Sequence, residues 1–220
     1  MDRNSPLPKD LTHYYKAPHP PMRSITELNP AEAERVIVGL SAANTIAFER
    51  FRSPVYLGQR RRAEASLRAK FVALGGQPIR SCPIYFVLGR SVAFFEKHEL
   101  DLRWVSIDLD ALPEQCVSFT YGDSSVNDLI ARGEWFRDEP SRQPWHAEVY
   151  RRHQLQALVE RIGLPPEWRP GRDHYIEAQL WMNPPSELVR PRAAGGSKTT
   201  GCRNDAAQPV AVPDGGHSIV

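Results

Sequence analysis

Arg60 and Glu64 are four residues apart in a stretch, residues 54–76, whose pattern predicts a helix. At about 100° per residue, Arg60 falls in the middle of the apolar side of that helix and Glu64 falls at its edge. The apolar side consists of Tyr56, Ala63, Leu67, Phe71 and Leu74. Because burying an unpartnered guanidinium is costly, Arg60 must pair with a carboxylate or line a cavity. Two interpretations stay open: an Arg60–Glu64 ion pair that closes the end of the core, or a cleft in which Arg60 binds a phosphate or carboxylate and Tyr56 stacks on a base or ribose.

A second group of polar side chains lies on the last predicted strand, Tyr175–Trp181. Alternation places Tyr175, Glu177, Gln179 and Trp181 on one face of this strand. A carboxylate flanked by aromatic rings suits a sugar, because the rings pack on its flat face and the carboxylate binds hydroxyls. We predict Glu177 as a catalytic residue, and Gln179 and Trp181 as ligand-binding residues. The alternative is an ordinary exposed strand face whose rings only cover the edge of the sheet.

A third stretch, Ser118–Ser124, runs from a predicted strand into a turn. Strand ends often build binding sites, so we include Thr120, Tyr121, Asp123 and Ser124 among the predicted ligand-binding residues. The stretch lacks the Gly-x-Ser-x-Gly elbow that exposes a nucleophilic serine. An Asx-type turn held by Asp123 and Ser124 is the alternative explanation.

Motifs for metal or cofactor binding are not evident. The histidines and acidic residues show no metal-ligand spacing, so no metal site is predicted. Neither a Gly-x-x-x-x-Gly-Lys phosphate loop nor a Gly-x-Gly-x-x-Gly motif after a strand occurs, which argues against kinase-like and dinucleotide-binding Rossmann folds. The three cysteines are widely spaced and there is no apolar leader, so we expect a cytoplasmic protein without a membrane span.

Composition predicts one folded domain with extensions at both ends. The chain has 220 residues, a formal net charge of +2 and 41% hydrophobic residues, which suits a single domain. We expect an extended N-terminal arm at residues 1–24, one domain at 25–186 and a disordered tail at 187–220. The tail is rich in Gly, Ala, Pro, Ser and Thr, and it cannot bury enough surface to offset its ordering entropy.

Periodicity predicts an α+β domain. The expected helices begin at Asn29-Pro30, span 54–76 and span about 152–162, and the expected strands lie at 84–88, 103–109, 117–121 and 175–181. Residues 124–147 are predicted to be irregular and carry Trp135, Phe136 and Trp145. Because helices and strands do not alternate strictly, we predict a small, mostly antiparallel sheet of about four or more strands packed with about three helices.

The sequence resembles a family of uncharacterised bacterial proteins from about residue 23 to residue 181. The motifs that carry this resemblance are Arg23-Ser24-Ile25-Thr26, Tyr56-Leu57 with Arg60 and Glu64, Gly75-Gly76-Gln77-Pro78, Pro83-Ile84-Tyr85 with Leu88-Gly89, Ser118–Ser124, and Tyr175–Trp181. The three groups of polar residues coincide with these motifs, and Tyr85 joins them as a predicted ligand-binding residue. The family brings no known activity.

The order of motifs is also similar to DNA-targeting ADP-ribosyltransferases of toxin–antitoxin systems. The shared order is an Arg-bearing helix, a Pro-x-Tyr-Phe strand, a Phe-Thr-x-Gly turn and a final Glu-bearing strand. In such enzymes an arginine grips the NAD phosphates, and a glutamate on a late strand serves the glycosidic chemistry. The resemblance implies NAD as a ligand, with Arg60 and Glu177 in these two roles.

From these observations we expect a domain that binds a phosphate-bearing nucleotide, with NAD as one candidate, and the question of catalysis stays open. One alternative is a non-enzymatic protein-interaction domain that meets its partner through the aromatic segment 124–147 and the basic clusters. Another is nucleic-acid binding through Arg61, Arg62 and Arg68, which would show affinity that falls steeply with salt.

Overall fold

The computed structural model describes residues 6–16, 19–42, 55–91, 102–134, 143–165 and 175–192. Within these ranges the α-helices are α1 (Pro30–Ala42), α2 (Tyr56–Ala73), α3 (Ser124–Arg132) and α4 (Leu155–Ile162). The strands are β1 (Asp10–Lys16), β2 (Ile84–Leu88), β3 (Leu102–Asp108), β4 (Val117–Tyr121), β5 (Ile176–Leu180) and β6 (Arg190–Arg192). The predicted α+β class and the antiparallel sheet are confirmed.

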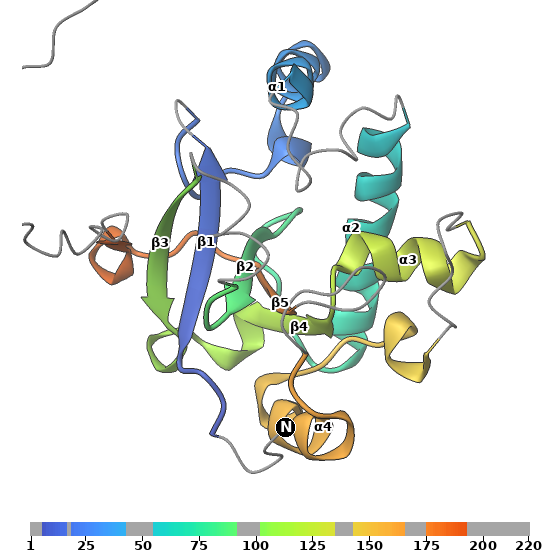
Figure 1. Ribbon diagram of the computed structural model, residues 1–220, viewed down its shortest axis with the longest axis vertical. Coiled ribbons are helices and arrows are strands. Elements are labelled where there is room, and N and C mark those ends of the chain that lie inside the picture. The colour runs from blue at the N-terminus through green and yellow to red at the C-terminus, as the bar shows by residue number, and fades with distance from the viewer. Residues whose placement is uncertain are drawn as a thin grey trace, which may run out of the picture.

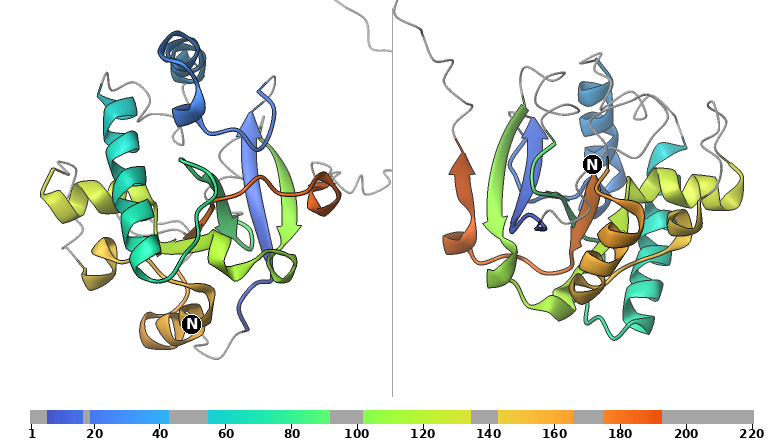
Figure 2. Two further views of the ribbon diagram at one scale, coloured as in Figure 1. Left: turned by 180° about the vertical axis from the view of Figure 1, so that it is seen from behind. Right: turned by 60° about the horizontal axis from the view of Figure 1, so that its bottom comes forward.

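The six strands form one antiparallel sheet in the order β4-β5-β2-β1-β3-β6. Figure 1 shows α2 running beside the β4–β5 end of this sheet, with α3 running across α2 in this view and α4 lying below β4. The right-hand view of Figure 2 shows β6 as the outer edge next to β3. The helices α2, α3 and α4 therefore gather at the β4–β5 end of the sheet, whereas α1 lies apart from it.

One face of the sheet is apolar. The cross-strand pairs show that β4, β5, β2, β1 and β3 all place apolar side chains on this face. The helix α4 packs against these side chains. The members of this core are Leu11, Ile84, Phe86, Leu88, Ile107, Val117, Phe119, Tyr121, Ile176, Ala178 and Leu180 from the strands, and Leu155, Leu158 and Val159 from α4. This cluster is the larger of two among the described residues, the other being Leu67, Phe71, Val149 and Trp181, and its burial supplies the main hydrophobic driving force for folding.

The opposite face of the sheet is polar and largely buried. It carries Ser118 and Thr120 on β4, Glu177 and Gln179 on β5, and Tyr85 on β2. The helix α2 covers this face with a mixed set of side chains: Tyr56, Arg60, Ala63, Glu64, Leu67 and Phe71. The predicted alternation along β5 is confirmed, but its polar face lies under α2, so an ordinary exposed strand face is the wrong interpretation.

Three elements differ from the prediction. The strand β1 lies between β2 and β3, although residues 1–24 are predicted as an extended arm. Because the polar residues Thr12 and His13 are buried next to Leu11, the sequence of β1 shows no alternation of apolar and polar residues. The strand β6 extends the domain into the predicted tail, whose residues 193–220 lie outside the described ranges. The helix α3 occupies the start of the segment predicted to be irregular.

The two ends of α2 follow local rules to different degrees. The helix begins after Val55, whose side chain makes no capping bond, and Ser53 and Pro54 lie outside the described residues. At the other end, Gly75 adopts φ of 83° and the N–H groups of Gly75 and Gly76 donate to the carbonyls of Val72 and Phe71. This is a Schellman motif, and it confirms the glycine pair as the helix stop. Leu74, predicted on the apolar side, is 40% exposed.

Two glycines of this region offer a matched stability test. A Cβ at Gly76 would lie 2.6 Å from ring carbons of the fully buried Phe71, whereas a Cβ at Gly58 within α2 meets nothing within 4 Å. We expect Gly76→Ala to lower the free energy of unfolding by about 1–3 kcal/mol through overpacking. Gly58→Ala should raise it by up to about 1 kcal/mol through helix propensity. Thermal melts check both, and equal midpoints for the two variants would contradict this packing.

A buried histidine ties β1 to the chain that follows it. The Nδ1 atom of His13 lies 2.7 Å from the carbonyl oxygen of Tyr85, and the N–H of Met22 donates to Nε2 at 3.2 Å. A carbonyl only accepts and an N–H only donates, so His13 is the neutral tautomer with its proton on Nδ1. Burial lowers the pKa of His13 below its ordinary 6.5, although its bond to the Tyr85 carbonyl opposes this change. Protonation at Nε2 would break the bond to Met22, a residue with φ of 65°.

The stability of the protein should therefore depend on His13 at mildly acidic pH. Between the lowered folded pKa and 6.5 the unfolded state binds more protons, so the free energy of unfolding falls as the pH drops below about 6.5. In His13→Gln this decrease should be absent from that window. Denaturant melts between pH 5 and 8 measure it, with His19→Gln, at a half-exposed position, as the control. The same pH slope in wild type and His13→Gln would show that His13 does not titrate in this way.

Candidate functional site: a buried polar cluster under helix α2

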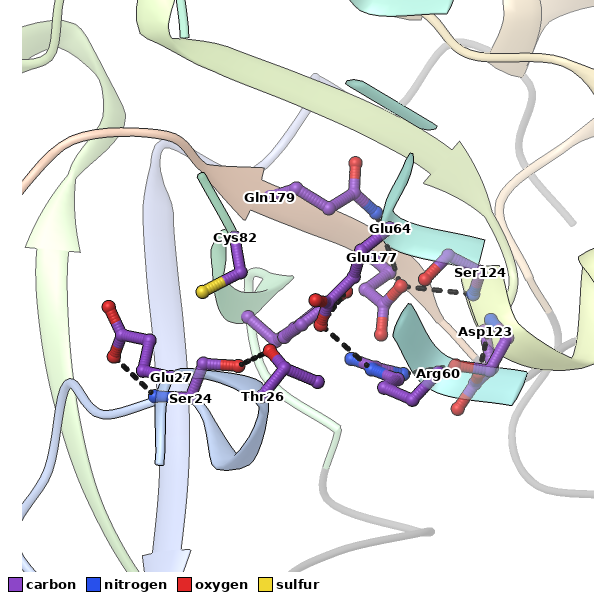
Figure 3. A network of polar contacts seen from close by, with 12 residues as sticks. Ser24, Thr26, Glu27, Arg60, Glu64, Cys82, Asp123, Ser124, Glu177 and Gln179 are labelled. Carbon is purple, nitrogen blue, oxygen red and sulfur yellow. Dashed lines mark hydrogen bonds and ion pairs between the residues drawn. The ribbon is translucent and has the colours of Figure 1, made fainter. Parts of the chain in front are cut away.

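Arg60 is the centre of the polar face, and its side chain is only 5% exposed. Its Nε lies 3.4 Å from Oε1 of Glu64, and its terminal nitrogen donates to Oγ of Ser125 at the start of α3. The guanidinium lies over the ring of Tyr85, 3.6 Å from the ring centroid. The predicted Arg60–Glu64 ion pair is thus present, and it is one part of a larger cluster (Figure 3).

Glu64 and Tyr85 connect α2 to the sheet. The hydroxyl of Tyr85 donates to Oε1 of Glu64 at 3.0 Å, the same oxygen that faces Arg60. Burial raises the pKa of Tyr85 well above its ordinary value, with Arg60 opposing and Glu64 and Glu177 reinforcing that effect. Tyr85 is therefore a neutral hydrogen-bond donor at physiological pH.

Glu177 lies beside Arg60 on the same face of the sheet, with 5% of its surface exposed. Its Oε2 accepts from the backbone N–H of Ser124 at 2.9 Å and from Nε2 of Gln179 at 3.1 Å. Burial raises the pKa of Glu177 above its ordinary 4.5, and repulsion from Asp123 adds to this, while Arg60 and the Ser124 bond oppose it. The native structure therefore favours the protonated form of this carboxyl group more than the unfolded chain does.

A chain of hydrogen bonds runs from Glu177 along β4 and β5. The Nε2 of Gln179 also donates to Oγ1 of Thr120 at 3.0 Å, and Oε1 of Gln179 accepts from Ser118 at 2.8 Å. The indole of Trp181 ends the chain by donating to Ser118 at 2.8 Å. Trp181 is fully buried and its ring lies 6.2 Å from that of Phe71, so it packs inside the core and has no free face for stacking on a ligand.

Asp123 joins the cluster as the N-cap of α3. Its Oδ1 accepts from the N–H groups of Ser125 and Val126, and its Oδ2 accepts from the hydroxyl of Tyr175 at 3.2 Å. The bond from the Ser125 N–H is that of the predicted Asx-type turn, and together with the bond from Val126 it caps α3. Because Asp123 fixes the start of α3, it places the N–H of Ser124 on Glu177 and the hydroxyl of Ser125 on Arg60.

The charges of the cluster do not balance if every group is ionised. One guanidinium, Arg60, faces the carboxyl groups of Glu64, Glu177 and Asp123. Burial alone would lower the pKa of Arg60, but electrostatic interactions with Tyr85 and Tyr56, and then with Glu177 and Asp123, raise it well above its ordinary value, so the group stays a cation. The surplus of carboxyl groups explains in part why the pKa of Glu177 is raised.

The structure brings together most of the predicted site residues but not all of them. On the polar face or at the start of α3 lie Tyr56, Arg60, Glu64, Tyr85, Thr120, Asp123, Ser124, Glu177 and Gln179, with Trp181 beneath α2. Tyr121 points to the opposite face, where it belongs to the apolar core and its hydroxyl donates to the carbonyl of Gly163 at 3.2 Å. It is therefore separated from Arg60 and Glu177 by the sheet.

Sequence reasoning missed Ser125 and Asn127, and it left Ser118 out of the site residues although the third stretch, Ser118–Ser124, contains it. Ser118 extends the hydrogen-bond chain, Ser125 is a partner of Arg60, and the amide of Asn127 donates to the carbonyl of Tyr121 at 2.8 Å. Two of these residues lie on α3. A signal for this helix is present, because Asp123 precedes Val126, Leu129 and Ile130 at helical spacing, and it would have placed Ser125 at the helix start.

Among the described residues, no group of three or more His, Cys, Asp or Glu side chains is arranged to hold a metal ion. Arg60 is the group that could contact a phosphate, and Glu177 is the group that could contact hydroxyls. None of the helices in the described ranges is long and apolar enough to cross a membrane.

Comparison of the chain with protein-family models, with curated proteins and with solved structures finds no match. The resemblances drawn from sequence motifs therefore remain predictions. The site has to be interpreted from its own geometry.

Replacing Glu177 by glutamine tests whether this carboxyl group strains the native state. The folded pKa is above 4.5, so ionisation costs stability as the pH rises from about 4.5 through the folded pKa. Glu177→Gln keeps the acceptor oxygen for Ser124 and removes this cost. We expect the variant to match wild type near pH 4.5 and to melt at a higher temperature at pH 8. The stability difference between Glu177→Gln and wild type should therefore move in favour of the variant from pH 4.5 to pH 8. A move in favour of wild type would contradict a raised pKa.

Proposed function

We propose that this chain is a cytoplasmic ligand-binding domain whose polar cluster receives a phosphate-bearing nucleotide, with NAD as the candidate. The observation that carries the proposal is the convergence of Arg60, Tyr85 and Glu177 on one buried face. These residues come from α2, β2 and β5. The two cysteines within the described ranges, Cys82 and Cys116, are free and buried, which agrees with a reducing compartment.

The energetics of the cluster support a functional role. A buried ion pair gains little over well-packed apolar side chains of similar volume, because desolvation offsets the attraction. Here the helix α2 buries both Arg60 and Glu64, and Glu177 lies next to them with a raised pKa. A perturbed carboxyl group with a specific charged neighbour is typical of functional sites.

The cluster also contains the contacts that a nucleotide would exchange. A phosphate on Arg60 replaces the hydroxyl of Ser125, which is a neutral partner and therefore the weaker one. Arg60 keeps its permanent charge for this purpose. The carboxyl group of Glu177 then lies within the same face for the hydroxyls of a ribose. Because the cluster is closed by Arg60 and Ser125, binding requires the start of α3 to separate from α2.

In an NAD complex the residues have distinct tasks. Arg60 binds the pyrophosphate, Tyr56 lies one turn before it on α2, and Glu177 holds or activates the ribose that carries the nicotinamide. A protonated Glu177 donates to a ribose oxygen, whereas an ionised one accepts from a hydroxyl. Turnover requires the ionised form to stabilise positive charge that develops on the ribose.

A protein-interaction role is the second candidate. Three large apolar side chains, Val72, Leu74 and Ile79, are exposed within eight residues at the end of α2 and just after it. Of the aromatic segment 124–147, Trp145 packs against Tyr121 with ring centroids 5.5 Å apart, and Trp135 and Phe136 lie outside the described residues. These three side chains are therefore the candidates for contact with a partner.

The nucleotide proposal predicts a stabilisation that depends on Arg60. The full chain is melted with NAD, ADP-ribose and inorganic phosphate, alongside Arg60→Lys and the neighbouring, exposed Arg61→Lys as a control. A ligand at about 100 times its dissociation constant adds roughly 2.7 kcal/mol, which raises the midpoint by several degrees for a domain of this size. Lysine keeps the charge but loses the planar fork. We expect NAD and ADP-ribose to stabilise wild type and Arg61→Lys, and to lose most of that effect in Arg60→Lys.

Two results would contradict the proposal. One is the absence of any shift with the three ligands in wild type. The other is an equal shift in Arg60→Lys, which would place the ligand away from the cluster. In either case Arg60 has a structural role, and the exposed apolar surface at the end of α2 becomes the better explanation of function.

A further inference from the structure

The outward side of α2 carries a line of exposed residues, which we call the outer seam. Its members follow one another at spacings of three and four residues, so they form one line along the helix surface. They are Val55, which directly precedes α2, and then Gly58, Arg62, Ala65, Ala69 and Val72. All of them are exposed, and the left view of Figure 2 shows α2 on the outside of the molecule.

The outer seam lies on the side of α2 away from the polar cluster. At about 100° per residue, it falls opposite the side that buries Arg60 and Glu64. Val55 and Val72, near its two ends, are 57% and 47% exposed. Neither belongs to the two hydrophobic clusters of the described residues. The helix therefore presents a second line of largely apolar character to solvent.

Two arginines beside the seam are not used by the fold. Most basic side chains in and near α2 bind carboxylates or backbone carbonyl groups: Arg62, Lys70, Arg151 and Arg152. Arg61 and Arg68 are exposed, and they have no ion-pair or hydrogen-bond partner among the residues that the structure describes. Their charges are therefore available to another molecule.

The position of these two arginines is that of partner-selecting charges in paired helices. Arg61 and Arg68 are seven residues apart, and each directly precedes a member of the seam. In a heptad pattern such positions flank the apolar contact and form salt bridges between helices, which set partner choice. The single acidic residue of α2 is Glu64, which is buried, so the outward side of the helix carries positive charge only.

A second copy of this chain does not supply the missing charges. If two α2 helices packed antiparallel, Arg61 of one copy would face Arg68 of the other, and like charges disfavour such a contact. If they packed parallel, the arginines would face the uncharged Ser66 and Ala73. The partner must therefore be a different chain.

Nucleic acid also fits this surface less well than a helix does. Affinity for nucleic acid is the sum of many phosphate contacts, whereas only Arg61 and Arg68 are free on this side among the described residues. A phosphate backbone has no apolar group that could cover Val55 or Val72. An amphipathic helix has such a side, and its apolar residues recur at the spacing of the seam.

We propose that the outer seam of α2 docks an acidic amphipathic helix of a partner protein. The apolar side of that helix covers the seam, and carboxylates seven residues apart on it bind Arg61 and Arg68. Because the seam lies opposite Arg60, this interaction does not depend on a nucleotide in the polar cluster.

The test is a nuclear magnetic resonance titration of the full chain with a synthetic helical peptide of about three heptads. The peptide carries Leu at the apolar heptad positions and Glu at the flanking ones, and repulsion between its glutamates opposes pairing with itself. We expect saturable shifts of the backbone amides of Ala65 and Ala69. A peptide with Lys in place of Glu, and one of the same composition in scrambled order, should not produce them.

Substitutions on the seam and beside it provide matched variants. Ala65→Glu keeps a good helix former and should abolish binding, whereas Ala157→Glu, at an exposed position of α4, should not. The double variant Arg61→Glu with Arg68→Glu should bind the glutamate peptide at least about tenfold more weakly and should bind the lysine peptide instead.

Four results would overturn the proposal. They are no saturable binding of the glutamate peptide, equal binding of the scrambled peptide, an unchanged preference in the double variant, and tighter binding of a DNA duplex at the same amides. The NAD experiment is independent of this test, because Arg60→Lys alters the opposite side of α2.

Discussion

The burial of one guanidinium constrains the whole polar half of this structure. Arg60 points from α2 into the sheet, and its charge must be satisfied by groups that the fold brings to it. Glu64 comes from the same helix, Tyr85 from β2 and Ser125 from α3. Each of these elements is therefore fixed relative to α2 by a specific polar contact as well as by apolar packing.

This constraint explains why the sheet has two different faces. The face toward α4 is held by hydrophobic burial, which is non-directional. The face toward α2 is held by hydrogen bonds that run from Trp181 through Gln179 to Glu177 and on to the start of α3. Directional bonds of this kind set the strand register and the position of α3, because an error of one residue would leave several buried groups unpaired.

The sequence was sufficient for elements whose pattern is local. The apolar side of α2, the glycine stop at Gly75 and Gly76, and the alternation of β5 each follow from a few neighbouring residues, and the structure contains all three. It was insufficient where burial is imposed from a distance. His13 looks like a residue of an exposed arm until Tyr85 and Met22 bind it. Likewise, the polar residues of β5 suggest an exposed face in the sequence. In the structure, α2 covers this face with Arg60 and Glu64.

The residues of the cluster differ in whether they stabilise the fold. Tyr85 and Gln179 are neutral and fully bonded, so they contribute to the fold. Glu177 is different: burial and the nearby Asp123 disfavour its charge, and a glutamine in its place could accept the same bonds. Within the described residues, Oγ of the adjacent Ser124 and Oδ1 of Asn127 have no hydrogen-bond partner. A strained carboxyl group is a cost that apolar packing would avoid, and costs of this kind are typical of functional sites.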